Sequence, residues 1–263
     1  MTDADAPVLL AIEAGVATLT LNRPDLLNAI DAATAQAFLG AVRAIAADDS
    51  VRAILIRGEG RAFCAGGDIS RFSEGGDPEA AITAIIDPLH EGLALLGSLR
   101  QPSVACLQGA VAGGGFSLAL ACDFAVAAEN AKFTMAYARI GGTLDASGSY
   151  HLVRAVGMKK AREIALLAEA FDAAEALRLG LVTHVVPLAD VRAEAEALAR
   201  RLADGPTQAY GRIRKLLDAS AGNSLQEQLD LERRTFAEAT RTADFREGIT
   251  AFLEKRPARF SGN

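Results

Sequence analysis

Two glycine-rich turns are the first features of this sequence with the residue types to do chemistry. The segment AFCAGGDI carries Gly67 next to an acid, and GAVAGGGFSLAL places Gly113, Gly114 and Gly115 before an apolar stretch. The start of a helix leaves its first backbone N–H groups without partners, and glycine lets another atom approach them closely. Two such turns directed at one point would stabilise a developing oxyanion. Taken alone, each turn is better explained by a tight bend, and neither fits a dinucleotide-binding or P-loop motif.

Three side chains are candidates for acid–base or nucleophilic roles. Asp145 lies in ARIGGTLDASGSYHL, where it is either the N-cap of a helix that starts near Ala146 or a general base. His90 lies on a predicted amphipathic helix, and we interpret it foremost as a surface or packing residue, with an auxiliary catalytic role as the alternative. Ser117 is not in a G-x-S-x-G motif, so we expect it to line a pocket or to hydrogen-bond within its helix.

The elements that must position these residues alternate between strand and helix. Strands are predicted on either side of a turn at 13–15 and over VRAILIRG, SVACLQG and FAVAAE, and helices over 32–48, over 78–99 and from the triple glycine onward. This alternation predicts an α/β fold. The end of the chain is helical, with a break at Gly205-Pro206 and a capping box from Ser224 to Glu227. We therefore predict an α/β core over residues 1–198 and a helical region over residues 199–263.

Composition and charge restrict the partners and the compartment. The net charge of −6 argues against binding to nucleic acid, which requires a basic face. Cys64, Cys106 and Cys122 are odd in number and lack metal-ligand spacing, which predicts buried thiols in a reducing compartment. His151 and His184 also lack such spacing, so no metal is expected. The N-terminus does not fit a secretory signal, and we expect no apolar run of membrane-spanning length, so the predicted location is the cytoplasm, away from membranes.

The chain resembles the enoyl-CoA hydratase/isomerase (crotonase) superfamily in four segments: LNRPDLLNAI, AFCAGGDI, GAVAGGGFSLALACDFAVAAENAKF and RAVGMKKAREIALL. The resemblance extends from Val8 to Phe260. It implies a crotonase-like α/β core of repeated β-β-α units, followed by a C-terminal helical region that packs trimers, often as hexamers. It also implies an acyl-CoA thioester substrate, with coenzyme A as part of the substrate and no separate cofactor.

The same resemblance implies roles for particular residues. The backbone N–H groups of Gly67 and Gly114 would hold the thioester oxygen and stabilise an enolate. Contacts with coenzyme A are implied for two turns, at Leu26, Leu27, Ala65, Asp68 and Ile69. The two glutamates that hydratases of this family use correspond to Ser117 and Tyr137, and neither side chain is a base near neutral pH. We expect these two residues to line the substrate site instead.

Asp145 corresponds to the working aspartate in two branches of the superfamily. The helical tail is most similar to the phenylacetate-pathway (epoxyphenylacetyl-CoA) isomerases, whereas GSYHLVRAVGMKKA is also similar to the chlorobenzoyl-CoA dehalogenases, in which a histidine matching His90 assists. Those dehalogenases surround an aromatic ring with residues that include Trp, and this chain has no Trp. We therefore predict isomerisation of a double bond in an unsaturated acyl-CoA, with Asp145 as the base, in fatty acid or aromatic catabolism. The alternatives are hydrolysis or dehalogenation through an Asp145 adduct, hydration by an atypical mechanism, and a non-catalytic binder of CoA thioesters.

Overall fold

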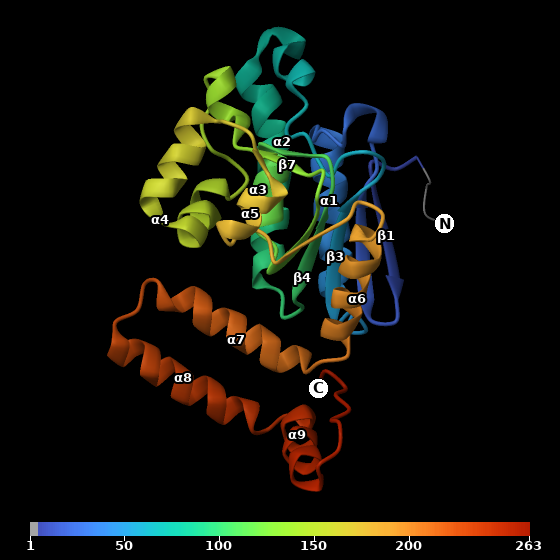
Figure 1. The fold of residues 1–263 in the computed structure, drawn as a ribbon, viewed down its shortest axis with the longest axis vertical. Coiled ribbons are helices and arrows are strands. Elements are labelled where there is room, and N and C mark those ends of the chain that lie inside the picture. The colour runs from blue at the N-terminus through green and yellow to red at the C-terminus, as the bar shows by residue number, and fades with distance from the viewer. Residues whose placement is uncertain (1–4) are drawn as a thin grey trace.

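The fold is built on two β-sheets with helices packed around them (Figure 1). The structure, a computed structural model, describes residues 5–263, apart from the side chains of residues 73–75, so residues 1–4 of the predicted core lie outside it. The larger sheet has the strand order β1-β2-β3-β4-β6-β9, and the smaller sheet has the order β5-β7-β8. The strands are β1 Val8–Glu13, β2 Val16–Leu21, β3 Ala53–Gly58, β4 Ser103–Leu107, β5 Ala110–Ala112, β6 Phe124–Ala128, β7 Lys132–Thr134, β8 Phe171–Asp172 and β9 His184–Val186. The helices are α1 Ala32–Ala47, α2 Pro78–Ser98, α3 Gly114–Leu120, α4 Gly148–Leu167, α5 Ala173–Arg178, α6 Val191–Ala203, α7 Thr207–Ser220, α8 Leu225–Ala239 and α9 Ala243–Glu254.

The central strands β3, β4 and β6 of the larger sheet are buried on both faces. Its neighbouring strands run parallel, except for the antiparallel edge pair β1 and β2. Successive residues of a strand point to opposite faces, so Ile54 and Ile56 of β3 pack into the main core with α1, α2 and α3. Ala53 and Leu55 pack on the other face, against α6. Burial of both faces explains why the strand sequences are apolar throughout, and it confirms the predicted α/β class.

The smaller sheet fixes the position of α3. Phe116 of α3 meets Phe133 of β7 and Phe171 of β8, with ring centroids 5.4 and 5.9 Å apart, and the last two rings stack on each other. The sequence did not predict β5, β7 and β8, because strands of two or three residues carry too little periodicity to be recognised. The aromatic cluster therefore anchors the helix that begins at the triple glycine.

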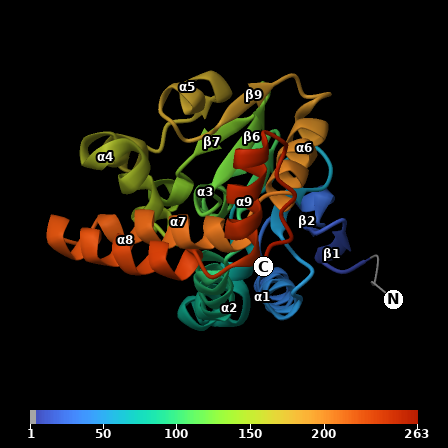
Figure 2. The same ribbon diagram turned by 90° about the horizontal axis from the view of Figure 1, so that it is seen from below.

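The C-terminal helices α7, α8 and α9 form a separate layer below the sheets (Figures 1 and 2). The predicted boundary between residues 198 and 199 falls inside α6, whose Ala195, Ala199 and Leu202 all pack on the sheet. The chain leaves the sheet at the turn around Gly205, whose carbonyl accepts a hydrogen bond from Arg52. The predicted capping box at the start of α8 is present.

Helix α2 corrects one expectation from the sequence. With 21 residues it is long and apolar enough to cross a membrane by length and composition, although no run of that kind was expected. In the structure, α2 packs against α1, and its Ile85, Leu89, Leu93 and Leu96 are buried in the main core. These apolar side chains of α2 are thus buried inside the folded chain.

Candidate active site

The first glycine turn, at residues 65–67, is held by backbone hydrogen bonds on both sides of Gly67. The Ile30 N–H donates to the Gly66 carbonyl at 2.8 Å, and the Asp68 N–H donates to the Ile30 carbonyl, also at 2.8 Å. In a planar trans peptide the N–H points opposite to the carbonyl, so the Gly67 N–H is directed away from Ile30. Within residues 5–263, no acceptor is bonded to this N–H. The Gly67 amide is therefore available to a ligand.

The second glycine turn starts α3. The Gly113 carbonyl accepts from the Ser117 N–H at 3.0 Å and so points along the helix, which directs the Gly114 N–H out of the helix N-terminus. Gly113 has a φ of 48°, in the left-handed region that favours glycine. A Cβ on Gly115 would lie 2.5 Å from the backbone oxygen of Cys64, so only glycine lets α3 approach this closely. The Gly114 amide, like that of Gly67, has no acceptor in the described part of the chain.

The two turns lie against each other. The Cys64 N–H donates to the Ala110 carbonyl at 3.1 Å, and the Ala112 N–H donates to the Cys64 carbonyl at 2.9 Å. A Cβ on Gly66 would lie 3.6 Å from the Cα of Gly113. The residues that precede the two candidate donors are thus in direct contact, as a shared site for one oxygen atom requires.

Ser117 and Tyr137, at the positions of the family's glutamates, contact each other. The Ser117 hydroxyl is fully buried and lies 3.2 Å from the Tyr137 hydroxyl, which donates to the backbone carbonyl of Asp145 at 3.2 Å. Burial raises the pKa of the Tyr137 phenol far above its ordinary value, so this group stays protonated near neutral pH. Neither side chain can serve as a general base there. The Tyr137 hydroxyl also lies 3.8 Å from the Cβ position of Gly114, which places this pair beside a candidate donor.

Asp145 and His90 form a close pair. The carboxylate oxygen Oδ1 of Asp145 lies 2.6 Å from Nε2 of His90, and the two side chains are 25% and 50% exposed. The interpretation of Asp145 as an N-cap is wrong, because α4 begins at Gly148 and its N-cap residue is Ser147. His90 lies at the surface, as the preferred interpretation expects, and its ring contacts the candidate base, so the auxiliary role stays a prediction. The sequence did not reveal this pair, because the two residues are 55 positions apart along the chain.

A cavity of about 730 Å³ opens in front of this pair. It is lined by His90, Leu93, Ala94, Gly97, Leu120, Ala121, Cys122, Asp123, Leu144, Asp145, Ala146, Ser147, Ser149, Tyr150, His151, Arg214 and Asp218. Gly67 and Gly114 are not among these described lining residues. Tyr137 links the two regions, because its hydroxyl donates to the Asp145 carbonyl and lies 3.8 Å from the Cβ position of Gly114. Arg214 of α7 was not singled out from the sequence, and it pairs with Asp123 at 2.6 Å, which ties α7 to the end of α3.

The residues expected to contact coenzyme A lie on neighbouring turns. The Ala65 N–H donates to the Leu27 carbonyl at 3.0 Å, which joins the first glycine turn to the turn that contains Leu26. Leu26 and Ile69 are 52% and 56% exposed, so both apolar side chains are open to a ligand. The Asp68 carboxylate is occupied by Arg23 and Ser70, whose hydroxyl hydrogen bond lowers its pKa. The roles assigned to these positions, and to the catalytic residues, stay predictions.

Comparison with known proteins identifies the family. A sequence model of the enoyl-CoA hydratase/isomerase family matches residues 11–263. The chain belongs to the enoyl-CoA hydratase/isomerase family. It is 42% identical to a probable enoyl-CoA hydratase from Rhodobacter capsulatus over 95% of this chain and 96% of that protein. It is 36% identical to the 1,2-epoxyphenylacetyl-CoA isomerase of Escherichia coli over 97% of this chain and 98% of that protein.

The fold agrees with this family. A crystal structure of an enoyl-CoA hydratase from Polaromonas sp. JS666 superimposes with a TM-score of 0.91 at 34% identity, over 96% of this chain and 99% of that chain. The resemblance to the crotonase superfamily, with relatives among the epoxyphenylacetyl-CoA isomerases, is thereby confirmed, as is the crotonase-like α/β fold with C-terminal helices. The chain is an acyl-CoA enzyme of the enoyl-CoA hydratase/isomerase family. These relatives are named both hydratase and isomerase, so the choice between the two reactions depends on the side chains of the site.

Proposed function

We propose that this protein isomerises a double bond in an unsaturated acyl-CoA, with Asp145 as its base. The observation that carries the proposal is the pairing of Ser117 with Tyr137 where a two-glutamate hydratase needs its carboxylates. Hydration requires one group to activate water and another to deliver a proton. Isomerisation requires only one base, because the group that takes a proton from one carbon returns it to another. The backbone carbonyl of Asp145 accepts a hydrogen bond from Tyr137, and Asp145 also lines the cavity.

The proposed reaction moves one proton and no other atom. Oδ2 of Asp145, which has no partner among the described residues, takes a proton from the α carbon of the thioester. The electron pair of that C–H bond moves into an enolate whose oxygen is bound by the amides of Gly67 and Gly114. The double bond then shifts, and the protonated Asp145 returns the proton at the γ carbon. His90 donates an N–H to Oδ1 and holds the carboxylate toward the substrate.

The test incubates the purified protein with a β,γ-unsaturated and an α,β-unsaturated acyl-CoA in D₂O. NMR spectroscopy then reports the position of the double bond, and mass spectrometry reports whether water has been added. We expect interconversion of the two isomers with no gain of the mass of water. A 3-hydroxyacyl-CoA product would contradict the proposal in favour of a hydratase. Absence of both isomer interconversion and deuterium incorporation would contradict it in favour of a non-catalytic binder.

The short contact between His90 and Asp145 favours one second candidate. In this route the Asp145 carboxylate attacks an aryl or acyl carbon, and the leaving group departs with its electron pair. Water, with His90 as the base, then hydrolyses the resulting aryl ester or acyl anhydride at the Asp145 carboxyl carbon. Single turnover in H₂¹⁸O separates the two candidates. The covalent route places ¹⁸O in Asp145, because water attacks the carboxyl carbon of the ester, whereas isomerisation leaves Asp145 unlabelled.

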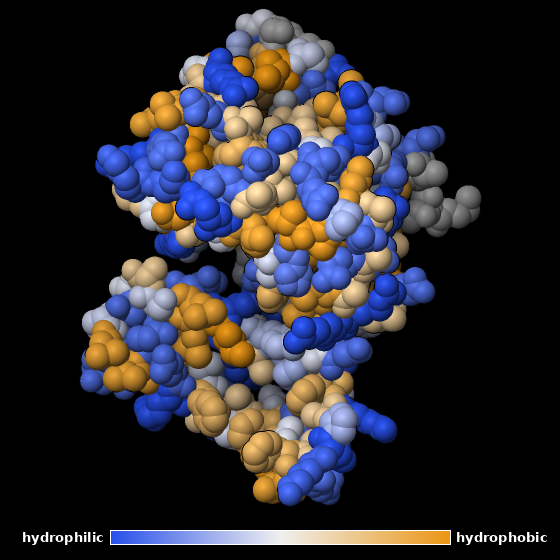
Figure 3. All heavy atoms as spheres, viewed as in Figure 1, coloured by the Kyte–Doolittle hydropathy of each residue, from blue (hydrophilic) through white to orange (hydrophobic). Residues whose placement is uncertain are grey.

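The proposal includes a homo-oligomer, a trimer or a dimer of trimers, built through the C-terminal helices. Several large apolar side chains of α7, α8 and α9 are exposed in the single chain, and the orange patches on the lower layer in Figure 3 show part of this surface: Ile213, Leu217, Leu225, Leu229, Phe236, Ile249, Phe252 and Leu253. Exposed apolar surface of this extent is typical of a protein interface. A cytoplasmic location and the absence of a cofactor other than the substrate's coenzyme A belong to the same proposal.

A further inference from the structure

Arg23 lies at the centre of a half-buried ion cluster beside the first glycine turn. It follows β2, and one of its guanidinium nitrogens lies 3.1 Å from a carboxylate oxygen of Asp31 and 3.1 Å from one of Asp68. Its other terminal nitrogen donates to the Ala29 carbonyl. The three charged side chains are only 12–17% exposed, so solvent screens these contacts less than it screens ion pairs on an open surface.

The cluster connects directly to the Gly67 amide. Asp68 is the next residue after Gly67, and its N–H donates to the Ile30 carbonyl, while the Ile30 N–H donates to the Gly66 carbonyl. These two hydrogen bonds set the direction of the Gly67 N–H, because each peptide unit is rigid. The Arg23 contacts fix the side chain of Asp68 and the carbonyl of Ala29, the residue before Ile30. The segment at Ala29–Ile30 and the segment at Gly67–Asp68 are thus both hydrogen-bonded to the same guanidinium.

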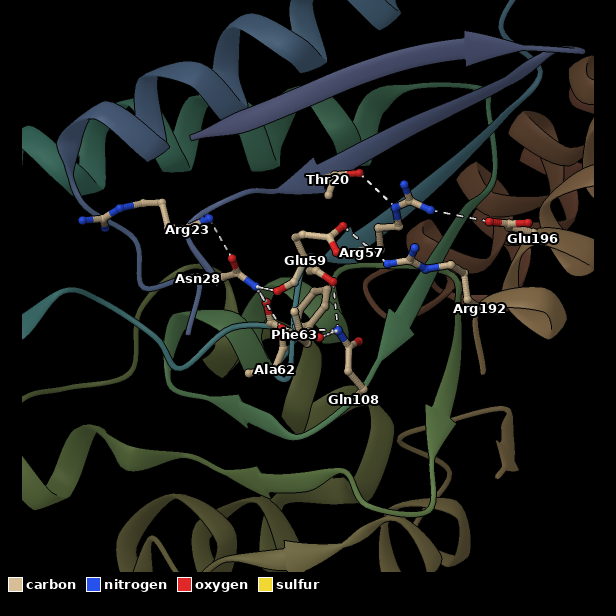
Figure 4. Close-up of polar contacts among 12 residues, drawn as sticks. Thr20, Arg23, Asn28, Arg57, Glu59, Ala62, Phe63, Gln108, Arg192 and Glu196 are labelled. Carbon is tan, nitrogen blue, oxygen red and sulfur yellow. Dashed lines mark hydrogen bonds and ion pairs between the residues drawn. The ribbon is translucent and has the colours of Figure 1, made fainter. Parts of the chain in front are cut away.

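A second contact of Arg23 supports the chain that leads into the turn. The Arg23 backbone N–H donates to the side-chain oxygen of Asn28 at 2.8 Å. The Asn28 amide nitrogen lies within 3.1 Å of the carbonyls of Glu59, Ala62 and Phe63, and Figure 4 shows this side chain directed into that segment. Arg23 therefore supports both ends of the loop from β3 to Gly67. Its backbone N–H binds Asn28, which holds the start of the loop, and its guanidinium binds Asp68 at the end of the loop.

We propose that Arg23 is a positioning residue for the oxyanion donor, which holds Asp68 and thereby aims the Gly67 amide at the thioester oxygen. The proposal rests on the function proposed above, in which Gly67 is one of the two donors. Without the guanidinium, the carboxylates of Asp31 and Asp68 would face each other with no cation between them, and their repulsion would push the Asp68 side of the pairing away from α1. A small displacement of a preorganised donor weakens its hydrogen bond to the developing charge.

The test reads the strength of the oxyanion site without turnover. A saturated acyl-CoA, butanoyl-CoA labelled with ¹³C at the thioester carbonyl, is bound to the protein, and infrared difference spectroscopy measures the carbonyl stretch. Hydrogen bonds to the oxygen lower this frequency relative to the ligand in water. We expect a clear downshift in the wild-type protein and loss of most of it in Arg23→Gln. We also expect kcat to fall about tenfold in this variant, with a smaller change in the Kd of the saturated ligand.

Arg57→Gln is the matched control. Arg57 is also a partly buried arginine, near the end of the interior strand β3, where it bonds Thr20 and Glu196 without touching the glycine turn. It should lose comparable stability in thermal unfolding while keeping the full carbonyl downshift. Arg23→Lys, which keeps the charge but lacks the planar fork, should retain part of the shift. Should Arg23→Gln not fold, Asp68→Asn breaks the same ion pair from the other side, and it should also reduce the downshift.

A full downshift in Arg23→Gln or in Asp68→Asn would overturn the proposal, as would equal loss of the downshift in Arg57→Gln. A wild-type protein without any downshift would overturn both the oxyanion site and the role of Arg23. A wild-type protein with the downshift but without isomerase activity would overturn the proposed reaction alone, and the comparison of Arg23 with Arg57 would still decide the positioning role.

Discussion

The two sides of the candidate site consist of different chemical groups, main-chain amides on one side and side chains on the other. The amide side, with Gly67 and Gly114, consists of main-chain groups whose directions are set by backbone hydrogen bonds and by the close contact of two turns. The acid side, with Asp145 and His90, consists of two side chains that contact each other and line a cavity. In the proposed reaction the amide side binds and polarises the thioester carbonyl, whereas the acid side transfers the proton. Changes of reaction within such a fold therefore need to alter only a few side chains on the acid side.

The largest effect is expected on the acid side. Asp145→Asn keeps the shape of the side chain but removes the base, so kcat for isomerisation should fall about 10³-fold, which corresponds to about 4 kcal/mol of barrier. The affinity for a saturated acyl-CoA should change little, because the amides still bind the carbonyl. Steady-state kinetics and isothermal titration measure the two quantities. Activity retained in Asp145→Asn would reject Asp145 as the base.

The second effect tests the amide side. Gly114→Pro removes the N–H at the first position of α3, where a helix tolerates proline, and kcat should fall about 10²-fold. Gly114→Ala is the matched control, since it keeps the N–H and its Cβ would lie 3.8 Å from the nearest atoms, an ordinary contact. Equal rates for the proline and alanine variants would show that this amide does not hold the oxyanion.

A smaller effect is expected at His90, which orients the base without replacing it. His90→Ala removes a hydrogen bond to a carboxylate, and the loss of about 1.5–3 kcal/mol should lower kcat by about 10- to 10²-fold. His90→Gln, which keeps an N–H donor, should recover part of the rate. Mass spectrometry of His90→Ala during turnover provides the contrast. Accumulation of an ester on Asp145 would contradict isomerisation and support the covalent route.

The smallest effect concerns the contact between the two sides. Tyr137→Phe removes the hydroxyl between Ser117 and the Asp145 carbonyl, which should cost about 1 kcal/mol of unfolding free energy and leave kcat nearly unchanged. The pKa of Tyr137 is raised in the folded state, so its ionisation opposes folding. The wild-type protein should lose stability as the pH rises above about 10, the unfolded value, and the variant should lose less. Thermal unfolding at neutral pH and at alkaline pH tests this, and identical pH dependence in both proteins would contradict it.

The sequence by itself determined the local features of this protein. The apolar strands, the helix capped by Asp31, the two glycine turns and the capping box at Ser224 all follow from signals within a few neighbouring residues, and the structure confirms each of them. The resemblance to the family was also readable, because its motifs are contiguous segments. The candidate residues at positions 67, 114 and 117 lie within those segments, and those at positions 137 and 145 lie between the third and the fourth. None of them was chosen from a distance.

Only the tertiary structure decided which of these features meet. The contact of His90 with Asp145, the pairing of Ser117 with Tyr137 and the arginine cluster at Arg23 join segments that the chain separates by 20 residues or more. A single sequence carries no record of such distances, because they depend on how the strands order in the sheet and how closely the helices pack. The short strands of the smaller sheet were missed for the same reason, since their stability comes from neighbours that only the fold supplies.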